Sequence, residues 1–135
     1  MSIVDLTRVG TPTFHTRVEA WETDFNGHWN TRFYCRSIQR AAEVAAALGG
    51  DTDPDGGITQ RRHMRFHREL RTGDAVEVRS FDVAGQGEPA TAHLLIHDGR
   101  VSATALDFGG RRNPALSAIP GELLAITLPR GVTGA

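Results

Sequence analysis

The sequence predicts an α+β fold in which a five-stranded antiparallel sheet wraps around one long central helix. Three observations predict it: a single Ala-rich segment has apolar residues at helical spacing, one alternating segment precedes it, and four follow it. The four later segments are joined by short links, which favour antiparallel pairing because parallel strands need a long crossover. One helix must then bury its apolar stripe against one sheet, and a single domain over residues 1–135 satisfies this requirement.

The N-terminal part contains one predicted strand. Residues 1–12 have no hydrophobic period, so we expect a loose arm there. From Phe14 to Trp21 apolar and polar residues alternate with the period of two that a strand requires. A loop over Asp24–Asn30 follows this strand.

The long helix is predicted to begin at Asn30 or Thr31, either of which can cap its first turn, and to run to about Leu48. Gly49 and Gly50 end it. Its apolar stripe, spaced at three or four residues, consists of Tyr34, Ile38, Ala41, Ala45 and Leu48. The small alanines on this stripe allow the helix to approach a sheet closely.

Four more strands are predicted at residues 58–70, 75–83, 91–97 and 101–108. Turn-forming residues separate them, and Asp98-Gly99 is a strong signal for a tight hairpin. The tail that begins at Gly109 contains Arg111, Arg112 and two prolines, and we expect it to cover a surface. The outer strands of such a sheet remain open, so pairing of two copies through an edge would protect them.

Composition limits the possible functions. The formal net charge is −1, so nothing calls for a nucleic acid or an anionic membrane surface as partner. No apolar run suits a secretory signal or a membrane span, and Cys35 is the only cysteine, so we expect a cytoplasmic protein. All 15 basic residues are arginines, which excludes Schiff-base chemistry and a P-loop lysine.

The run from Trp21 to Asn30 is the most informative stretch for function. It places Asp24, Gly27, His28 and Asn30 within seven positions, directly before the predicted helix. A carboxylate can act as a nucleophile or as a general base. The N–H groups of the first helical turn, around Asn30 and Thr31, carry the positive end of the helix dipole and could stabilise an oxyanion.

These residues resemble the Asp-x-x-Gly-His-Val-Asn-Asn loop of hotdog-fold acyl-CoA thioesterases, the 4-hydroxybenzoyl-CoA thioesterase-like superfamily. The matching positions are Asp24, Gly27, His28 and Asn30. The order of predicted elements agrees with that family over nearly the whole chain. Two positions depart from its pattern: Trp29 replaces a small aliphatic residue, and Thr31 replaces a second Asn.

The resemblance implies hydrolysis of an acyl-CoA thioester, or of an acyl-carrier-protein thioester, without a metal or redox cofactor. It implies that Asp24 is the catalytic carboxylate and that the amide near Thr31 contributes to the oxyanion site. His28 and Asn30 would hydrogen-bond within the loop or to the substrate. Gly27 would let the backbone approach the substrate closely, and Trp29 could reshape the acyl pocket.

Further expectations concern coenzyme A and assembly. The phosphates of coenzyme A need cations, and we select Arg111 and Arg112 beyond the last strand rather than the arginine cluster between residues 61 and 71. The resemblance also implies a homodimer or a homotetramer, a dimer of dimers, with the active site near a subunit interface.

Two other functions remain open. One is a non-catalytic acyl-CoA-binding hotdog protein. The other is a hotdog dehydratase or hydratase that uses His28 and Glu43, although Glu43 lies close to the side of the helix opposite the apolar stripe.

We expect no metal site. His63 and His67, and likewise His93 and His97, are spaced at i and i+4 on predicted strands. At about 3.3 Å per residue the members of each pair lie about 13 Å apart, too far for one ion. We therefore expect these histidines to be exposed or to lie in an interface.

Overall fold

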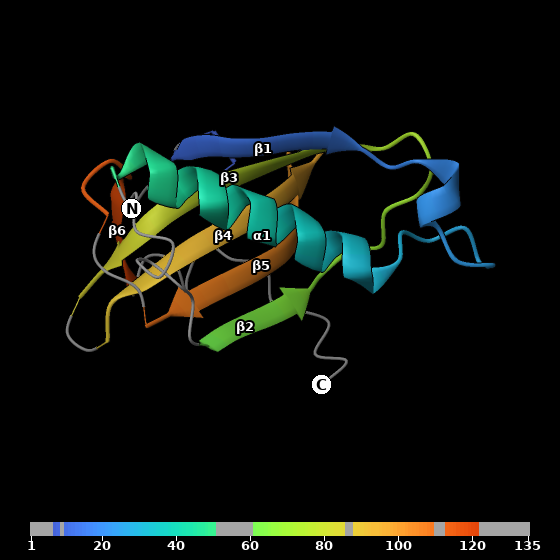
Figure 1. The fold of residues 1–135 in the computed structure, drawn as a ribbon. Coiled ribbons are helices and arrows are strands. Elements are labelled where there is room, and N and C mark those ends of the chain that lie inside the picture. The colour runs from blue at the N-terminus through green and yellow to red at the C-terminus, as the bar shows by residue number, and fades with distance from the viewer. Residues whose placement is uncertain (1–6, 9, 51–60, 86–87, 110–112, 122–135) are drawn as a thin grey trace.

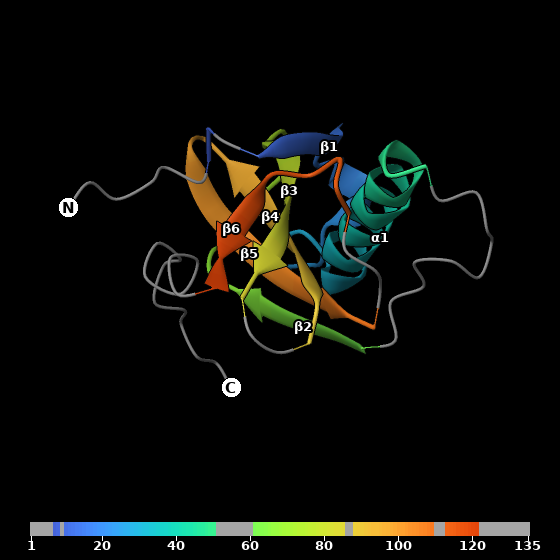
Figure 2. The same cartoon turned by 90° about the vertical axis from the view of Figure 1, so that its left-hand side faces the viewer.

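The computed structural model describes residues 7–8, 10–50, 61–85, 88–109 and 113–121. Its elements are β1 (Thr11–Arg17), the short 3-10 helix η1 (Ala20–Glu22), α1 (Thr31–Leu48), β2 (Arg61–Phe66), β3 (Ala75–Ala84), β4 (Ala90–His97), β5 (Arg100–Phe108) and β6 (Ala118–Pro120). Figure 1 shows α1 lying along the sheet, and Figure 2 places it to one side of the strands.

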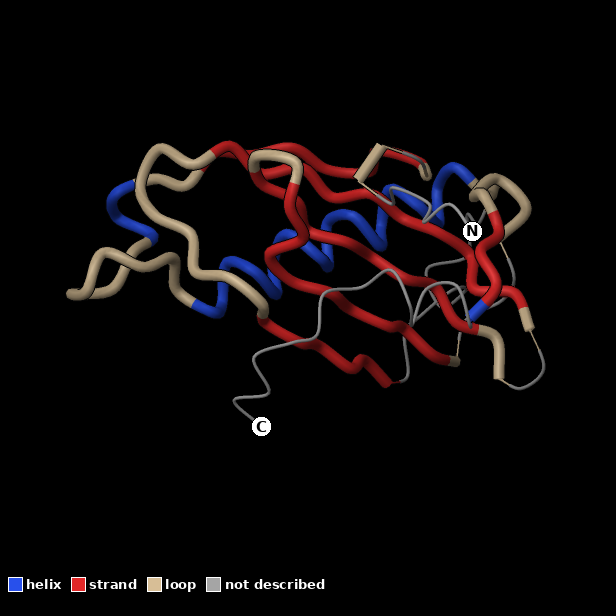
Figure 3. Tube along the Cα trace, turned by 180° about the vertical axis from the view of Figure 1, so that it is seen from behind, coloured by secondary structure: helices blue, strands red, loops and turns tan. Residues whose placement is uncertain are grey.

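The sheet has the order β1-β3-β4-β5-β2, and every neighbouring pair on this path is antiparallel. The predicted fold class is therefore confirmed. Seen from behind, the strands lie in front of the helix (Figure 3). One strand was not predicted: β6 pairs in parallel with residues 82–84 of β3, just past the part of β3 that pairs with β1. Three residues are too few to give an alternating signal.

The long helix begins and ends where the sequence predicts. Asn30 is its N-cap and Gly49 its C-cap. Its buried residues are Phe33, Tyr34, Ser37, Ile38, Ala41 and Ala45. Leu48, expected on the stripe, is 51% exposed because it lies in the last turn. Complete burial of a side chain such as Ile38 contributes about 1.5–3 kcal/mol to stability.

Three predicted strand boundaries were wrong by three or more residues. β1 begins at Thr11, inside the expected arm, and ends at Arg17 instead of continuing to Trp21. The chain leaves the strand because a capping box between Glu19 and Glu22 starts η1. β2 ends at Phe66 and not at Leu70, and the expected start of that strand lies outside the described residues.

A buried polar chain crosses the sheet, which the sequence did not reveal. Ser80 Oγ lies 2.8 Å from Thr13 Oγ1 and 2.7 Å from His93 Nδ1. His93 Nε2 lies 3.2 Å from Asp107 Oδ2, and Arg62 donates to both oxygens of that carboxylate at 2.6 and 2.8 Å. His93 is 1% exposed within this single chain, so the expectation that it is exposed or lies in an interface was wrong.

Burial raises the pKa of the Asp107 carboxyl, but hydrogen bonds from Arg62 and His93 outweigh burial and hold this pKa well below its usual range. The chain lies on the face of the sheet that packs against α1, because His93 and Asp107 are two residues away from Leu95 and Ala105 of the helix-side core, and residues i and i+2 of a strand share a face. Among the described residues, none of the helices combines the length and the apolar composition that a membrane span requires.

Candidate functional site

The Asp24 loop is a tight hairpin that projects beyond the N-terminal end of α1 (Figure 1). Thr23 and Trp29 form an antiparallel bridge at its base. Asp24 N–H donates to the His28 carbonyl at 2.9 Å, and Gly27 N–H donates to the Asp24 carbonyl at 2.9 Å. Gly27 has φ +78°, a conformation that glycine adopts without strain. The sequence Asp-x-x-Gly therefore encodes a turn closed by a left-handed residue.

The Asp24 carboxylate is exposed and its orientation is fixed by the loop. Its Oδ1 atom accepts hydrogen bonds from the N–H groups of Asn26, at 2.9 Å, and of His28, at 3.2 Å. This is the local bonding pattern by which Asp orders turns. All hydrogen bonds of this carboxylate to described residues go to Oδ1, so Oδ2 is left to meet a ligand or water.

The loop is also tied to the segment between β2 and β3. Trp29 N–H donates to the Leu70 carbonyl at 2.7 Å, and His28 and Arg71 form an antiparallel bridge. The imidazole Nε2 of His28 lies 3.0 Å from Glu69 Oε2 and 3.4 Å from Arg71 Nη2. Two charged side chains that the sequence reasoning did not assign to the site, Glu69 and Arg71, are thus in contact with His28.

Tyr34 links the helix to the same segment. Its hydroxyl donates to the Arg68 carbonyl at 3.3 Å and accepts from the Leu70 N–H at 3.1 Å. Burial raises the pKa of Tyr34 to about 12, so the phenol is neutral and keeps both bonds at physiological pH. The sequence placed Tyr34 only on the apolar stripe, and nothing in the sequence predicts its bonds to residues more than thirty positions away.

Most backbone N–H groups at the start of α1 are already hydrogen-bonded. Asn30 Oδ1 accepts from Arg32 N–H at 3.1 Å, and the Asn30 carbonyl accepts from Phe33 N–H at 2.9 Å. Asn30 N–H itself donates to the Glu22 carbonyl at 2.9 Å. Within the described part of the chain, Thr31 N–H has no partner. Of the two amides expected around the helix start, that of Asn30 is therefore paired, and its side chain acts as the helix cap.

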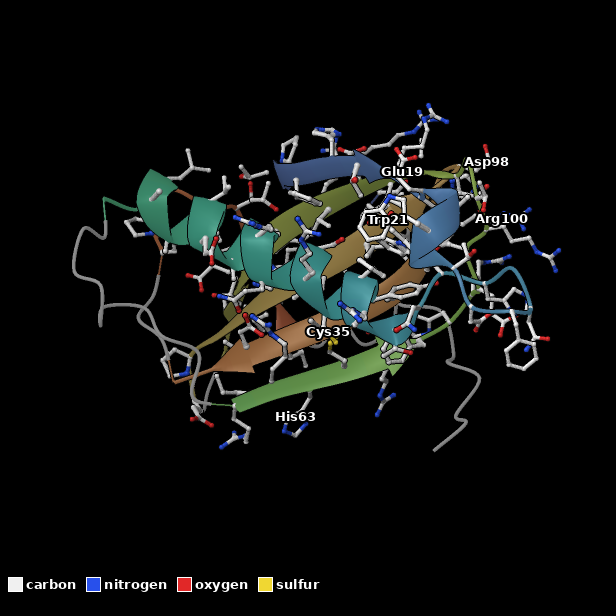
Figure 4. The ribbon with its side chains drawn as sticks, turned by 45° about the vertical axis from the view of Figure 1, so that its right-hand side comes forward. Glu19, Trp21, Cys35, His63, Asp98 and Arg100 are labelled. Carbon is white, nitrogen blue, oxygen red and sulfur yellow. The ribbon has the colours of Figure 1, made fainter. Side chains whose placement is uncertain are left out.

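The aromatic residues around the loop are of two kinds, one buried in the core and two exposed to solvent. Trp29 is 4% exposed, packs against Phe33 and Tyr34, and donates through Nε1 to Glu22 Oε1 at 3.3 Å. Its side chain is part of the core in this single chain. Trp21, labelled in Figure 4, is 70% exposed, and Phe25 at the hairpin tip is 97% exposed.

The structure does not bring His28 and Glu43 together. Glu43 is exposed on α1, where it contacts Gln39 and Arg40. It lies twelve residues after Thr31, which corresponds to about 18 Å along the helix axis. Arg111 and Arg112 lie outside the described residues.

The part of the chain that the structure describes contains no group of three or more His, Cys, Asp or Glu side chains placed to hold a metal ion. Cys35 is exposed, with its sulfur 3.7 Å from that of Met64, and lies between α1 and β2 in Figure 4.

Neither a protein-family model nor a curated protein matches the sequence. Solved structures do resemble the fold. A candidate thioesterase from Pseudomonas putida is 20% identical, with a TM-score of 0.63 over 88% of this chain and 83% of the other. A thioesterase from Thermus thermophilus, complexed with coenzyme A and Zn, is 21% identical, with a TM-score of 0.56 over 82% and 88% of the two chains.

A hypothetical protein from Staphylococcus aureus in complex with CoA gives a TM-score of 0.61 at 15% identity, over 90% of this chain and 88% of the other. At these identities the likeness establishes architecture. These neighbours superpose on most of the chain, which in this protein consists of one long helix against an antiparallel sheet in the order β1-β3-β4-β5-β2. The resemblance drawn from the Asp24 loop and the element order is therefore confirmed at the level of the fold, and this chain has the hotdog fold.

Proposed function

We propose that this chain hydrolyses acyl-CoA thioesters to a free acid and coenzyme A. The observation that carries the proposal is the Asp24 hairpin, which presents an exposed, oriented carboxylate on the loop that leads into the N-terminus of α1. Neighbours of the same fold that are named thioesterases or were solved with coenzyme A support it.

The chemistry uses residues of the loop and the helix start. Asp24 Oδ2 attacks the thioester carbonyl or removes a proton from the attacking water. Thr31 N–H, at the positive end of the helix dipole, stabilises the oxyanion. The C–S bond breaks with its electron pair going to sulfur, and coenzyme A leaves as a thiolate. Where Asp24 is the nucleophile, water then hydrolyses the acyl-aspartate anhydride to the free acid; where water attacks, the acid forms directly. His28 and Asn30 keep the loop and the helix cap in place, and the reaction needs no cofactor.

The substrate contacts are proposed from the sequence. Gly27 gives the thioester access to the loop backbone, and Trp29 borders the acyl pocket. Arg111 and Arg112 bind the phosphates of coenzyme A. Neutralising this pair, in Arg111→Gln/Arg112→Gln, should raise KM for an acyl-CoA but not for the matching acyl-pantetheine, which lacks those phosphates. An equal change for both substrates would count against the assignment.

We propose that the active form is a homo-oligomer, a dimer or a dimer of dimers. β1 and β2 are the end strands of the described sheet path, so each leaves one edge without a strand partner on that path. An unpaired edge is a template for another chain. Light scattering coupled to gel filtration tests this: a monomer at micromolar concentration would contradict it.

The central experiment measures thiol release over short, branched, long and aryl acyl-CoAs for the wild type and for Asp24→Asn. We expect the variant to lose about 10²–10⁴-fold in kcat, the usual contribution of a positioned acid or base. Asp98→Asn is the matched control, because Asp98 lies in another tight hairpin at the same end of the molecule (Figure 4).

Activity that survives undiminished in Asp24→Asn would remove Asp24 from the mechanism. Coenzyme A binding without thiol release across the whole panel would favour the non-catalytic binding protein. Hydration of an enoyl-CoA that depends on both His28 and Glu43 would favour the dehydratase, against the separation of these residues in the structure.

A further inference from the structure

His28 lies between two groups that need opposite states of the same nitrogen. Its Nε2 is 3.0 Å from Glu69 Oε2 and 3.4 Å from Arg71 Nη2. An ionised carboxylate only accepts hydrogen bonds and a guanidinium only donates them. Nε2 must therefore carry a proton to bond to Glu69, and must lack one to accept from Arg71. The two contacts cannot both be hydrogen bonds at the same moment.

The backbone holds all three residues in this arrangement. His28 and Arg71 are paired in an antiparallel bridge, and the adjacent Trp29 N–H donates to the Leu70 carbonyl. Arg71 N–H is held by Asp74 Oδ2 at 2.8 Å. The choice of partner is therefore left to the side chains: the imidazole is 24% exposed, and the Glu69 side chain is 70% exposed.

We propose that His28 is a protonation-dependent switch. In the neutral ring Nε2 is bare and accepts from Arg71, so the ring proton is on Nδ1. In the imidazolium, Nε2–H donates to Glu69, which acts as its positioning residue. Three charged groups of the described residues set this balance: Glu69 and Arg71 on the segment between β2 and β3, and Asp24 on the hairpin, which accepts from the His28 backbone N–H.

The switch would also act in the proposed thioester hydrolysis, by a proton transfer from His28 to the leaving group. This proton transfer rests on the proposed function. With Nε2–H held by Glu69, the imidazolium has a second donor, Nδ1–H. That proton passes to the sulfur of the leaving coenzyme A as the C–S bond breaks, which leaves the neutral ring with its proton on Nε2. Proton exchange with water then moves this proton to Nδ1, and Nε2 accepts from Arg71. A thiol leaves in place of a thiolate, and water later returns a proton to the ring.

The switch is tested without reference to activity, by NMR titration of the His28 ring resonances, assigned by their absence in His28→Gln. Removing the negative charge, in Glu69→Gln, should lower the midpoint of the His28 titration by about half a pH unit, a size set by the exposure of the pair. Removing the positive charge, in Arg71→Met, should raise it by a similar amount.

Arg100→Met is the control, since Arg100 is an exposed arginine at the same end of the molecule that is placed on the β4–β5 hairpin (Figure 4). Midpoints that stay unchanged in both Glu69→Gln and Arg71→Met, or that move no more than in Arg100→Met, would overturn the switch.

The pH profile of thiol release separates this inference from the proposed function. We expect the limb of kcat/KM assigned to His28 to move in the same direction as the NMR midpoint in each variant. If the NMR midpoint falls in Glu69→Gln and rises in Arg71→Met but the protein releases no thiol, the switch is supported and the proposed hydrolase activity is refuted. Activity with a pH profile that neither variant moves would refute the role of the switch in the reaction.

Discussion

Gly27 is the residue on which the shape of the Asp24 hairpin depends. Its φ of +78° is in the left-handed region, and a Cβ added there would meet no atom within 4 Å. A substitution therefore acts through backbone strain and not through a clash. Because the Gly27 N–H closes the turn onto the Asp24 carbonyl, strain at Gly27 also displaces the carboxylate.

We expect Gly27→Ala to destabilise the fold by about 1–2 kcal/mol, the cost of a left-handed conformation for a residue with a Cβ. Gly27→Asn should cost less, since Asn tolerates this region. Urea unfolding measures the change, and Gly121→Ala is the control, because its Cβ would make only ordinary contacts. Equal losses for the Ala and Asn variants would argue against strain as the cause.

At the scale of single residues, the sequence predicts the role of a residue where neighbouring positions in the chain determine that role. Asp24 and Gly27 fit positions of one turn, and Asn30 fits a helix cap, so a run of seven residues was sufficient to place them. Glu69 and Arg71 lie more than forty positions from His28 and have no local signature. Their contact with His28 exists only because the segment after β2 folds back along the hairpin.

At the scale of elements, the polar chain from Thr13 to Arg62 joins β1, β3, β4, β5 and β2 through side chains. Alternation predicted the strands but assigned polar residues to the outer face by default. Here the charged side chains of Asp107 and Arg62 pair on the face of the sheet that packs against α1. The hydrophobic period of the strands alone cannot reveal such a pair. A buried pair of this kind is costly to break, because removing one partner leaves the other charge unpaired.

Arg62 and Arg61 are neighbours on β2 and make a matched pair of tests. Arg62 holds the 6% exposed carboxylate of Asp107, whereas Arg61 pairs with Glu88 near the surface. We expect Arg62→Met to destabilise the fold by about 3 kcal/mol, the lower end for a broken buried pair because Arg62 is partly exposed.

Arg61→Met should cost about 1 kcal/mol or less, as for exposed pairs. Urea unfolding of both variants is the measurement. Similar losses for the two would mean that the buried chain does not hold the strands together.

The Tyr34 hydroxyl joins α1 to the segment that carries Glu69 and Arg71. We expect Tyr34→Phe to lower stability by about 1–3 kcal/mol, because Leu70 N–H and the Arg68 carbonyl lose their partner. Hydrogen exchange at Leu70 should rise by more than exchange in β4, which does not touch the phenol. Exchange that rises equally in both places would indicate a global loss and not a local one.

At the scale of the whole molecule, hydrophobic period and turn signals predicted the order of the elements. The bounds of the helix and of the β4–β5 hairpin were predicted accurately, because Asn30, Gly49 and Asp98-Gly99 mark their ends. The start of β1 and the strand β6 were missed because pairing with β3 decides them. A strand of three residues such as β6 exists only because the end of β3 offers it an edge.

The stability of the whole molecule should fall in acid through Asp107. Its folded pKa is depressed, so its contribution is fully present above the unfolded pKa of about 3.9 and is lost as pH falls toward the folded value. The unfolded chain binds a proton there while the folded chain does not. This one group should remove about 1 kcal/mol between pH 5 and pH 3.

The measurement is the free energy of unfolding in urea at pH 6, 5, 4 and 3, for the wild type and Asp107→Asn. The variant is less stable at pH 6 because its amide cannot replace the carboxylate between Arg62 and His93. Below pH 5, however, its stability should fall less steeply than that of the wild type. Asp98→Asn, an exposed site, should follow the wild type. Parallel curves for wild type and Asp107→Asn would show that other carboxyl groups cause the acid loss.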